Sequence, residues 1–393
     1  MALGLLAAFS PFAVDVYLPA FPSIVREFGS TATGVQLSLT FFIVAMAIGM
    51  PVFGTLSDRF GRRPCILVAV AVCIVASAAA ALAPTLEFLL AARALQGFTS
   101  AAGVVVGRAV VADLATGDVA ARAYGMVAIV GNVAPVVAPV VGAFAAIVSW
   151  RFTLWVLVAL AVALMVICAI VLPESNPPER RMVRAERRAG PTALQPLLGR
   201  RFIGNALVAA SVTMLMFGYV AAAPFIYQEV MGFDRLAFAA IFALSAIGML
   251  ATNWYTNRLI GRFTVRGIML VGLAATVGAA ASLLVLVLAG VRDAWLVIPM
   301  VLFVSCTGAT LPKAVALAMA EVRSIAGTGS AVLSVAQFGV GSISTPLVGL
   351  SGSDSPLAFA LVIAATSVLA GLAAWLAGGG RFGLAVAEPA PEG

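Results

Sequence analysis

The stretch GTLSDRFGRRP, residues 54–64, places one aspartate, three arginines and two glycines between two long apolar runs. A helix needs roughly 20 mostly apolar residues to cross a bilayer, and both flanking runs have about that length. Charges that cluster so tightly between two such runs predict a short loop at a membrane surface. The stretch therefore indicates a helical membrane protein.

The composition of the whole chain excludes a soluble globular protein. Of the 393 residues, 63% are hydrophobic and only 10% are charged. A soluble domain carries about 25% charged residues, which it needs to cover its surface. The sequence also lacks the alternating ~10-residue segments of an outer-membrane barrel. We therefore take the bilayer as the solvent of this chain.

Twelve apolar segments of spanning length follow one another along the chain. Their approximate bounds are 2–22, 35–55, 65–83, 86–107, 122–147, 152–172, 202–223, 236–256, 267–290, 295–317, 330–350 and 357–378. The one long connection is polar and Arg-rich. We predict an all-α polytopic membrane protein with twelve transmembrane helices. Its parts are an N-terminal six-helix bundle (1–173), a cytoplasmic linker (174–201), a C-terminal six-helix bundle (202–379) and a short cytoplasmic tail (380–393).

The placement of the basic residues predicts the orientation, because loops rich in Lys and Arg stay cytoplasmic. With both termini inside, most of the 23 Lys and Arg residues lie on the cytoplasmic side, Lys313 among them. The outer loops hold Arg26, Arg151, Arg235 and Arg292. The net charge of +7 then reflects topology and contact with anionic lipid, and we expect no nucleic-acid partner. The first segment lacks a basic flank and a cleavage pattern, so we expect it to remain as a span.

A weak internal repeat supports the division into two halves. Shifting the sequence by about 200 residues places the motif residues of the second-to-third loop on those of the eighth-to-ninth loop. The pairs are Leu56 with Leu259, Arg59 with Arg262, Phe60 with Phe263 and Arg63 with Arg266. Many secondary transporters consist of two such halves with the substrate site between them.

The opening stretch resembles the signature of the major facilitator superfamily, G-x-L-x-D-R-x-G-R-[KR]. Its residues here are Gly54, Leu56, Asp58, Arg59, Gly61, Arg62 and Arg63. We expect a gate at the cytoplasmic surface, in which Gly54 allows close helix approach and Gly61 permits a tight turn. Asp58 would bind the N-terminus of the eleventh helix, near Gly329 and Ser330, where backbone amides lack partners. The alternative is a charged turn that only sets topology.

Five further stretches resemble the bicyclomycin-resistance (Bcr/CflA) branch of drug–proton antiporters. They are DVYLPAFP (15–22), RALQGFTSAAG (93–103), APVVAPVVGA (134–143), WRFTLW (150–155) and AGTGSAVL (326–333). The resemblance spans nearly the whole chain. It implies proton-coupled efflux of drugs across the bacterial inner membrane by alternating access, with a lipophilic drug, protons and lipids as partners. We expect a monomer without cofactor or metal.

Asp15 is the candidate proton carrier, because it is the one acid well inside a predicted span. Ionisable residues inside a membrane are expensive and mark functional sites by default. Pro19 and Pro22 lack backbone N–H groups and open the helix around Asp15. Opened backbone at that depth must face protein or a water-filled cavity. The alternative is a structural aspartate bonded to its neighbours.

Arg93 is predicted to be the one base inside a span, and the resemblance implies that it supports proton coupling. Helical spacing places it on one face with Gln96, Gly97 and Ser100, where small residues permit close packing. Gln96 would bond the guanidinium. Arg93 could instead only tie backbone carbonyls together, and the sequence does not establish an ion pair with Asp15.

The fifth segment resembles a degenerate form of the antiporter motif, G-x-x-x-G-P-x-x-G-G. The segment carries Gly131, Pro135, Pro139 and Gly142, spaced four, four and three residues apart. Ala134 stands before Pro135, and Ala138 and Pro139 stand where the last two glycines are usual. Pro135 and Pro139 each free a carbonyl one turn earlier. We expect this helix to kink and to pack at the outer gate.

Polar and aromatic residues on the expected cavity-facing helices are the candidates for drug contact. They are Tyr17, Gln96, Asn132, Phe217, Tyr219, Tyr227, Gln228 and Gln337. Each is about as well suited to helix packing or to the membrane boundary. With one acid at depth, the cavity favours neutral or weakly charged lipophilic drugs such as phenicols or bicyclomycin.

Other classes of protein fit the residues less well. An enzyme would need a nucleophile, metal ligands or paired acids, and the chain has no His. A structural or receptor role would leave Asp15 and Arg93 without a purpose. The serious alternative is an importer or uniporter of a small metabolite, which would share the fold and the cytoplasmic gate.

Overall fold

The computed structural model describes residues 2–114, 117–177, 195–322, 325–350, 352 and 355–378. The predicted tail and most of the predicted linker lie outside the described residues, so the structure does not test them. Within the described residues, twelve helices are long and apolar enough to cross a membrane, as predicted.

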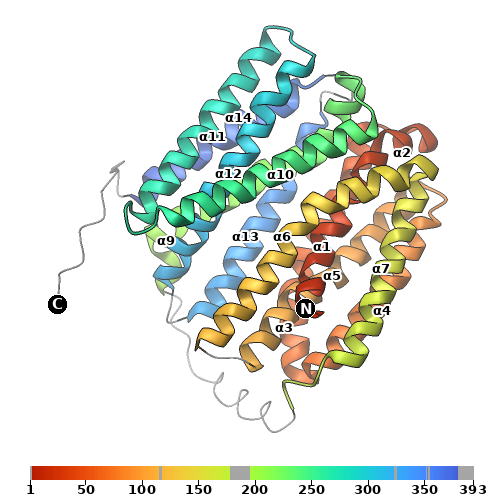
Figure 1. The fold of residues 1–393 in the computed structure, drawn as a ribbon, viewed down its shortest axis with the longest axis vertical. Coiled ribbons are helices and arrows are strands. Elements are labelled where there is room, and N and C mark those ends of the chain that lie inside the picture. Colours follow the sequence, from red (N-terminus) through yellow and green to blue (C-terminus); the bar gives the residue numbers. More distant parts are fainter. Residues whose placement is uncertain are drawn as a thin grey trace. The chain divides into compact units, whose positions relative to one another are not determined.

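The helices of the first half follow the predicted spans closely (Figure 1). Their bounds are α1 Ala2–Asp15, α2 Phe21–Phe28, α3 Ala32–Phe60, α4 Arg62–Ala81, α5 Leu86–Leu114, α6 Gly117–Val148 and α7 Trp150–Val171. Side chains fix where several of them begin. The Thr31 hydroxyl accepts from the Gly34 N–H at α3, and Ser149 caps α7 in the same way. Such caps bond amides that have no partner within the helix.

The helices of the second half repeat this order. They are α9 Arg200–Phe225, α10 Arg235–Arg258, α11 Val265–Leu288, α12 Val297–Glu321, α13 Ala326–Val348 and α14 Leu357–Ala377. A π-helical turn, Ile226–Val230, extends α9. Short 3-10 turns precede α9 and α12.

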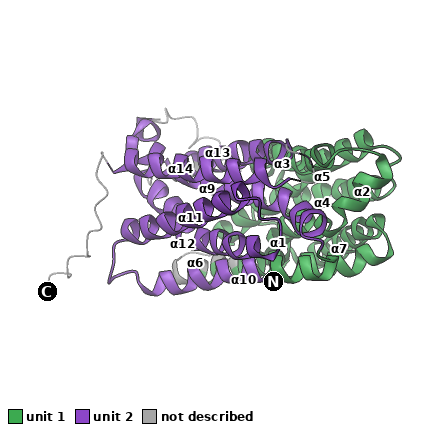
Figure 2. Cartoon of the chain, turned by 90° about the horizontal axis from the view of Figure 1, so that it is seen from above, with its two compact units in different colours: residues 1–191, 233–243 green, residues 192–232, 244–393 purple. Residues whose placement is uncertain are grey.

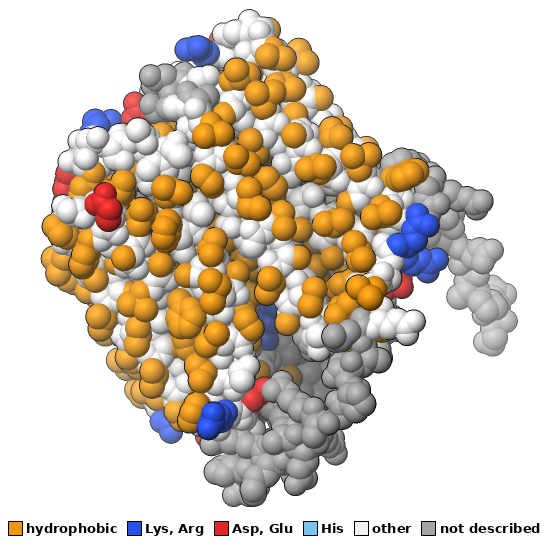
Figure 3. Space-filling view, turned by 180° about the vertical axis from the view of Figure 1, so that it is seen from behind, with side chains coloured by type: hydrophobic (Ala, Val, Ile, Leu, Met, Phe, Trp, Pro, Cys, Tyr) orange, Lys and Arg blue, Asp and Glu red, His pale blue; other side chains and the backbone are white. Residues whose placement is uncertain are grey.

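The surface of these helices suits lipid rather than water. Ile48, Val68 and Ile170 are 57%, 63% and 78% exposed and belong to a long series of exposed large hydrophobic residues. In Figure 3, hydrophobic side chains dominate the visible face, and the few charged side chains stand mainly toward its margins. In a bilayer, these side chains contact the lipid tails. In water, a large exposed apolar surface of this kind would cause the protein to aggregate.

The chain forms two compact units, coloured separately in Figure 2. Unit 1 comprises Met1–Pro191 with Phe233–Ala243, and unit 2 comprises Thr192–Gly232 with Leu244–Gly393. The same helix pairs pack in both: α4 with α5 and α7 in unit 1 corresponds to α11 with α12 and α14 in unit 2. The pair α1 and α6 likewise corresponds to α9 and α13.

The weak sequence repeat corresponds to a repeated contact. Arg63, at the start of α4, donates to the Ala169 carbonyl of α7 at 2.7 Å. Arg266, at the start of α11, donates to the Ala374 carbonyl of α14 at 3.0 Å. Gly61 and Gly261 precede these arginines with φ of 104° and 100°, a conformation that glycine adopts without strain. The predicted tight turn at Gly61 is therefore confirmed.

The first span is broken where its prolines predicted an opening. α1 ends at Asp15, a 3-10 turn covers Leu18–Ala20, and α2 begins at Phe21. The Ala20 N–H donates to the Tyr17 carbonyl at 3.0 Å instead of continuing the α-helical ladder. Pro19 has no N–H to donate to the Asp15 carbonyl. The break thus places a carboxyl at the end of a helix inside the span.

Candidate functional site

Asp15 is buried at this break and is 5% exposed. Among the described residues, no hydrogen bond or ion pair reaches its carboxyl group. An ionised carboxylate without partners is costly in such a place, whereas a protonated carboxyl is cheaper. The alternative of a structural aspartate held by bonded neighbours finds no support in these contacts.

Arg93 lies two turns into α5 and is completely buried. One guanidinium nitrogen donates to the Gln96 side-chain oxygen and another to the Ala13 carbonyl, the latter at 3.1 Å. Its Cζ atom stands 4.3 Å from the ring centre of Tyr17 and 4.5 Å from that of Phe42. The predicted bond between Gln96 and the guanidinium is confirmed. Arg93 and Asp15 do not form an ion pair.

The Arg93 environment continues through a chain of polar groups in unit 1. The Gln96 amide donates to the Ser77 hydroxyl at 2.7 Å, and Ser77 donates to the Cys73 carbonyl at 2.7 Å. Both polar ends of Gln96 are therefore occupied, and the residue is fully buried. Its predicted contact with drug stays a prediction. Ser77 was missed from the sequence because a small hydroxyl in an apolar run gives no signal of its own.

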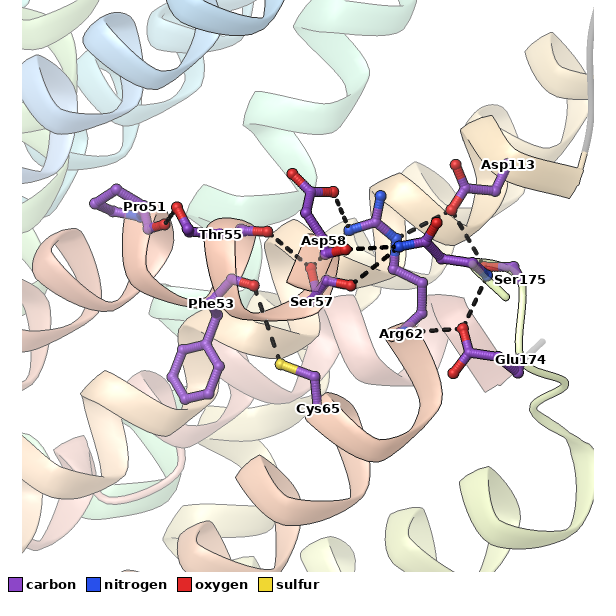
Figure 4. A network of polar contacts seen from close by, with 12 residues as sticks. Pro51, Phe53, Thr55, Ser57, Asp58, Arg62, Cys65, Asp113, Glu174 and Ser175 are labelled. Carbon is purple, nitrogen blue, oxygen red and sulfur yellow. Dashed lines mark hydrogen bonds and ion pairs between the residues drawn. The ribbon is translucent and has the colours of Figure 1, made fainter. Parts of the chain in front are cut away.

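The signature stretch forms a buried network where α3 ends and α4 begins (Figure 4). Arg62 is 3% exposed. Its guanidinium bonds Asp58 at 2.8 Å, Asp113 of α5 at 3.0 Å and the Ser57 hydroxyl at 2.7 Å. The predicted contact of Asp58 with the N-terminus of α13 stays a prediction. Two carboxylates around one guanidinium make this network a charge-compensated core.

Glu174, just after α7, completes the network and was missed from the sequence. Its carboxylate accepts from the backbone N–H groups of Arg62 at 2.9 Å and Arg63 at 3.2 Å, the first residues of α4. Asn176 donates from its side chain to the Asp58 carbonyl at 3.1 Å. An acid placed directly after an apolar span was the available signal, because amides at a helix start attract negative charge.

Gly54 does not make the close helix approach that was expected of it within unit 1. A Cβ there would meet the nearest atom, Val105 Cγ1, at an ordinary 3.6 Å. Gly49 makes that approach instead, since a Cβ there would lie 2.4 Å from the Phe98 carbonyl oxygen of α5. The physical reason is that α3 and α5 approach each other closely at Gly49, about three turns before the end of α3. Arg59 lies over the exposed Phe60 ring, at 5.3 Å.

The predicted antiporter helix is α6, and both of its prolines lie inside it. Gly142 faces the break in the first span: a Cβ there would lie 1.8 Å from the Val16 carbonyl oxygen. Gly131 has open space around it, with nothing within 4 Å of a built Cβ. The side chain of Asn132 lies outside the described residues.

The remaining drug-contact candidates lie in unit 2 in two groups. Phe217 of α9 packs on Phe338 of α13, and Gln337 donates to Thr213 at 3.3 Å. On another face of α9, the Tyr219 hydroxyl bonds Ser245 at 3.1 Å. Tyr227 is completely buried and lies in the π-helical turn with Gln228. Their roles in drug contact stay predictions.

Lys313 corrects the prediction that Arg93 is the one base inside a span. Lys313 does not lie in a cytoplasmic loop. It sits inside α12, 2% exposed, and donates to Asn253 and Thr256 of α10, both at 2.9 Å. The predicted span 295–317 already contained Lys313, and counting the residue with the cytoplasmic charges was the error. Neutral oxygens bind the ammonium, so its burial needs no acid that the sequence could have revealed.

The chain belongs to the major facilitator superfamily. The family model described as "Major Facilitator Superfamily" matches residues 3–346. The fold, the signature network and the repeated helix packing agree with this membership. The protein is therefore a membrane transporter by family, and its twelve apolar helices make it a multi-pass protein of the bacterial inner membrane.

Among curated relatives, the chain is 31% identical to "Uncharacterized MFS-type transporter YdgK" of Bacillus subtilis, over 94% of this chain and 93% of the relative. It is 25% identical to "Bicyclomycin resistance protein homolog" of Haemophilus influenzae, over 95% and 94%. It is 26% identical to "Multidrug resistance protein MdtL" of Escherichia coli, over 66% of each chain.

Solved structures of low sequence identity share the fold. A crystal structure of a D-xylose-proton symporter matches with a TM-score of 0.76 at 15% identity, over 95% of each chain. A bacterial homologue of the lysosomal transporter Spinster, inward-facing and unoccupied, matches with a TM-score of 0.73 at 17% identity, over 96% of this chain and 95% of that one. At such identities the likeness concerns the fold alone.

Proposed function

We propose that this protein exports lipophilic drugs from the cytoplasm in exchange for protons, by alternating access. The observation that carries the proposal is the isolated Asp15 carboxyl, buried at a break in the first span. A carboxyl without fixed partners can bind a proton from one side of the membrane and release it to the other. The relatives that are named for bicyclomycin and multidrug resistance support a drug as the cargo.

Each half of the proposed cycle assigns a task to residues of this chain. Asp15 takes up a proton while the site faces outward and loses it to water while the site faces the cytoplasm. Arg93 supports the ionised carboxylate by its charge in the same unit. The aromatic and amide groups around Phe217 and Gln337 offer apolar surface with a few hydrogen bonds, which suits neutral drugs such as phenicols or bicyclomycin. We also propose that both termini are cytoplasmic, that the protein is a monomer and that it contacts anionic lipid.

The test uses inverted membrane vesicles whose lumen has been acidified by respiration. Adding chloramphenicol, florfenicol or bicyclomycin to wild-type vesicles should release protons from the lumen, reported by a pH-sensitive dye. Asp15→Asn, which mimics the protonated carboxyl, should reduce this release at least about tenfold, the scale of losing one coupled group. Glu87→Gln, an exposed acid in the first turn of α5, is the matched control and should respond like the wild type.

Two outcomes would contradict the proposal. Proton release from Asp15→Asn vesicles at the wild-type level would show that another group carries the proton. The protein would be identified as an importer if none of the three drugs released protons in wild-type vesicles and protons moved only when a metabolite was loaded in the lumen.

A further inference from the structure

The charge balance around Arg93 differs from that of an ordinary buried arginine. In unit 1, the apolar stretches of α3, α4, α6 and α7 carry no Asp, Glu, Lys or Arg, and Asp15 and Arg93 are the two charges that remain at depth. Yet the two do not pair. When Asp15 is protonated, the Arg93 guanidinium has no negative charge beside it in this part of the protein. Something else must stabilise a charge that is costly to bury.

Two aromatic rings take the place of the missing carboxylate. Tyr17 follows Asp15 by two residues in the broken span, and Phe42 lies on α3. Their ring centres are 4.3 Å and 4.5 Å from the guanidinium carbon, well inside the ~6 Å within which a cation interacts with a ring face. Such contacts are strongest where water is excluded, and Arg93, Tyr17 and Phe42 are all completely buried.

Independent contacts hold each ring in position. The Tyr17 hydroxyl bonds the Ser38 hydroxyl at 2.6 Å, and its ring meets Phe21 edge-on at 4.9 Å. The backbone of Phe42 presses on Gly97, where a Cβ would lie 2.1 Å from the Phe42 carbonyl oxygen. Because α3 and α5 meet at this point, Phe42 is fixed one turn from Arg93. Groups other than Arg93 and Asp15 therefore hold both rings in place.

We propose that Tyr17 and Phe42 are positioning residues of the proton-coupling site. They hold the Arg93 guanidinium away from Asp15 and so allow that carboxyl to keep its proton. This inference rests on the proposed drug–proton exchange. It gives Tyr17 a different task from the drug contact that its sequence position suggested.

The consequence is a defined change when a ring is lost. Arg93 then lacks one of its two ring contacts and turns toward Asp15, which follows by two residues the Ala13 carbonyl that the guanidinium already bonds. The cation favours the ionised carboxylate, so binding a proton requires more acid. Tyr17 and Cys73 are the other titratable groups that interact with Arg93. Both are neutral near pH 7 in their ordinary state and add no competing charge.

The experiment measures drug-evoked proton release against pH in the vesicles described above, with whichever of the three drugs the wild type responds to. Tyr17→Leu and Phe42→Leu should each move the midpoint of the profile to lower pH, by about one unit, which is a tenfold change in proton affinity. Tyr17→Phe and Phe42→Tyr keep a ring and should rescue the wild-type midpoint. Equilibrium binding of the same drug to purified protein should change less than about twofold, since a tenfold change would need 1.4 kcal/mol of drug contact.

A fluorinated phenylalanine at position 42 covers the case in which a leucine variant does not fold. Fluorine weakens the negative ring face and leaves the size of the ring nearly unchanged, so the same shift should appear, smaller in size. A wild-type midpoint in this variant and in the leucine variants would overturn the inference. Loss of drug affinity with an unchanged midpoint in Tyr17→Leu would overturn it as well.

Failure of this inference is distinguishable from failure of the proposed function. If the wild type shows no drug-evoked proton release, the proposed function fails before any ring variant is measured. If the wild type responds and Asp15→Asn does not, the exchange stands. The ring variants then decide the positioning role by themselves.

Discussion

Arg62 and Arg93 are both almost fully buried, yet different groups stabilise them. Arg62 is the first residue of α4, at the end of a span, and meets Asp58 and Asp113, whose carboxylates cost less there than inside a span. Arg93 lies two turns inside its span and meets two rings, a carbonyl and an amide oxygen. Position along the span explains the difference, because every additional charge inside a span carries its own cost of burial.

At the same scale, we expect Glu174 to contribute more to the free energy of unfolding than an exposed surface charge does. Its carboxylate bonds two amides at the start of α4. Glu174→Ala removes both acceptors, and loss of a helix cap costs about 1 kcal/mol. The apparent melting temperature in detergent should fall by about 2–4 °C, as expected for units of this size.

Glu321→Ala is the control for this measurement. Glu321 is an exposed acid at the last residue of α12, where negative charge is unfavourable. Its removal should leave the melting temperature unchanged or raise it slightly. Equal losses in the two variants would show that Glu174 acts as a plain surface charge.

Among the helices, the contact between α6 and the broken first span stands out. The backbone of α6 at Gly142 leaves no room for a side chain beside the Val16 carbonyl, next to Asp15. The prolines of α6 free the carbonyls of Gly131 and Pro135, about two turns or more before this contact. Tight helix contact through small residues is the usual means of packing in a bilayer.

Gly142→Ala should therefore impair transport by displacing the break. A Cβ at 1.8 Å from the Val16 oxygen forces the backbones apart, and we expect drug-evoked proton release to fall at least about tenfold, on the scale of a misplaced coupling group. Gly125→Ala, in the same helix with nothing within 4 Å of the added Cβ, serves as the control. Wild-type transport by Gly142→Ala would mean that the helices yield without moving Asp15.

For the whole molecule, the repeated contacts of Arg63 and Arg266 explain how a weak sequence match corresponds to a strong structural one. Each arginine binds a carbonyl near the C-terminus of the sixth helix of its half. The C-terminal end of a helix attracts a cation, so this contact needs one basic residue and few other identities. The rest of each half needs apolar residues of suitable size, which can vary freely between repeats.

The orientation of the whole chain can be tested with single introduced cysteines. Cys65, Cys73 and Cys168 are buried, and Cys306 is half-buried, so the native background should be low. With cytoplasmic termini, Ala294→Cys in the outer loop before α12 should react with a membrane-impermeant maleimide in intact cells. Arg262→Cys in the loop after α10 should react only after permeabilisation. The reverse pattern would mean that the basic loops do not set the topology of this chain.

The amino-acid sequence by itself determined the number of spans, their approximate bounds, the break after Asp15 and the tight turn at Gly61. These follow from local physics: the length of apolar runs, the missing N–H of proline and the backbone freedom of glycine. The bond between Arg93 and Gln96 was also predictable, since both lie one turn apart on a helix.

Only the tertiary structure decided how the buried charges are stabilised. Phe42 on α3, Glu174 after α7 and the partners of Lys313 on α10 come from elements far away in the sequence. Nothing in the sequence shows that a phenylalanine in an apolar run will contact a cation. Similarly, the sequence does not distinguish an isolated lysine near the end of a span from a lysine in a loop. Sequence patterns report the periodicity and polarity of one segment, whereas the energy of a buried charge depends on whichever groups the fold brings against it.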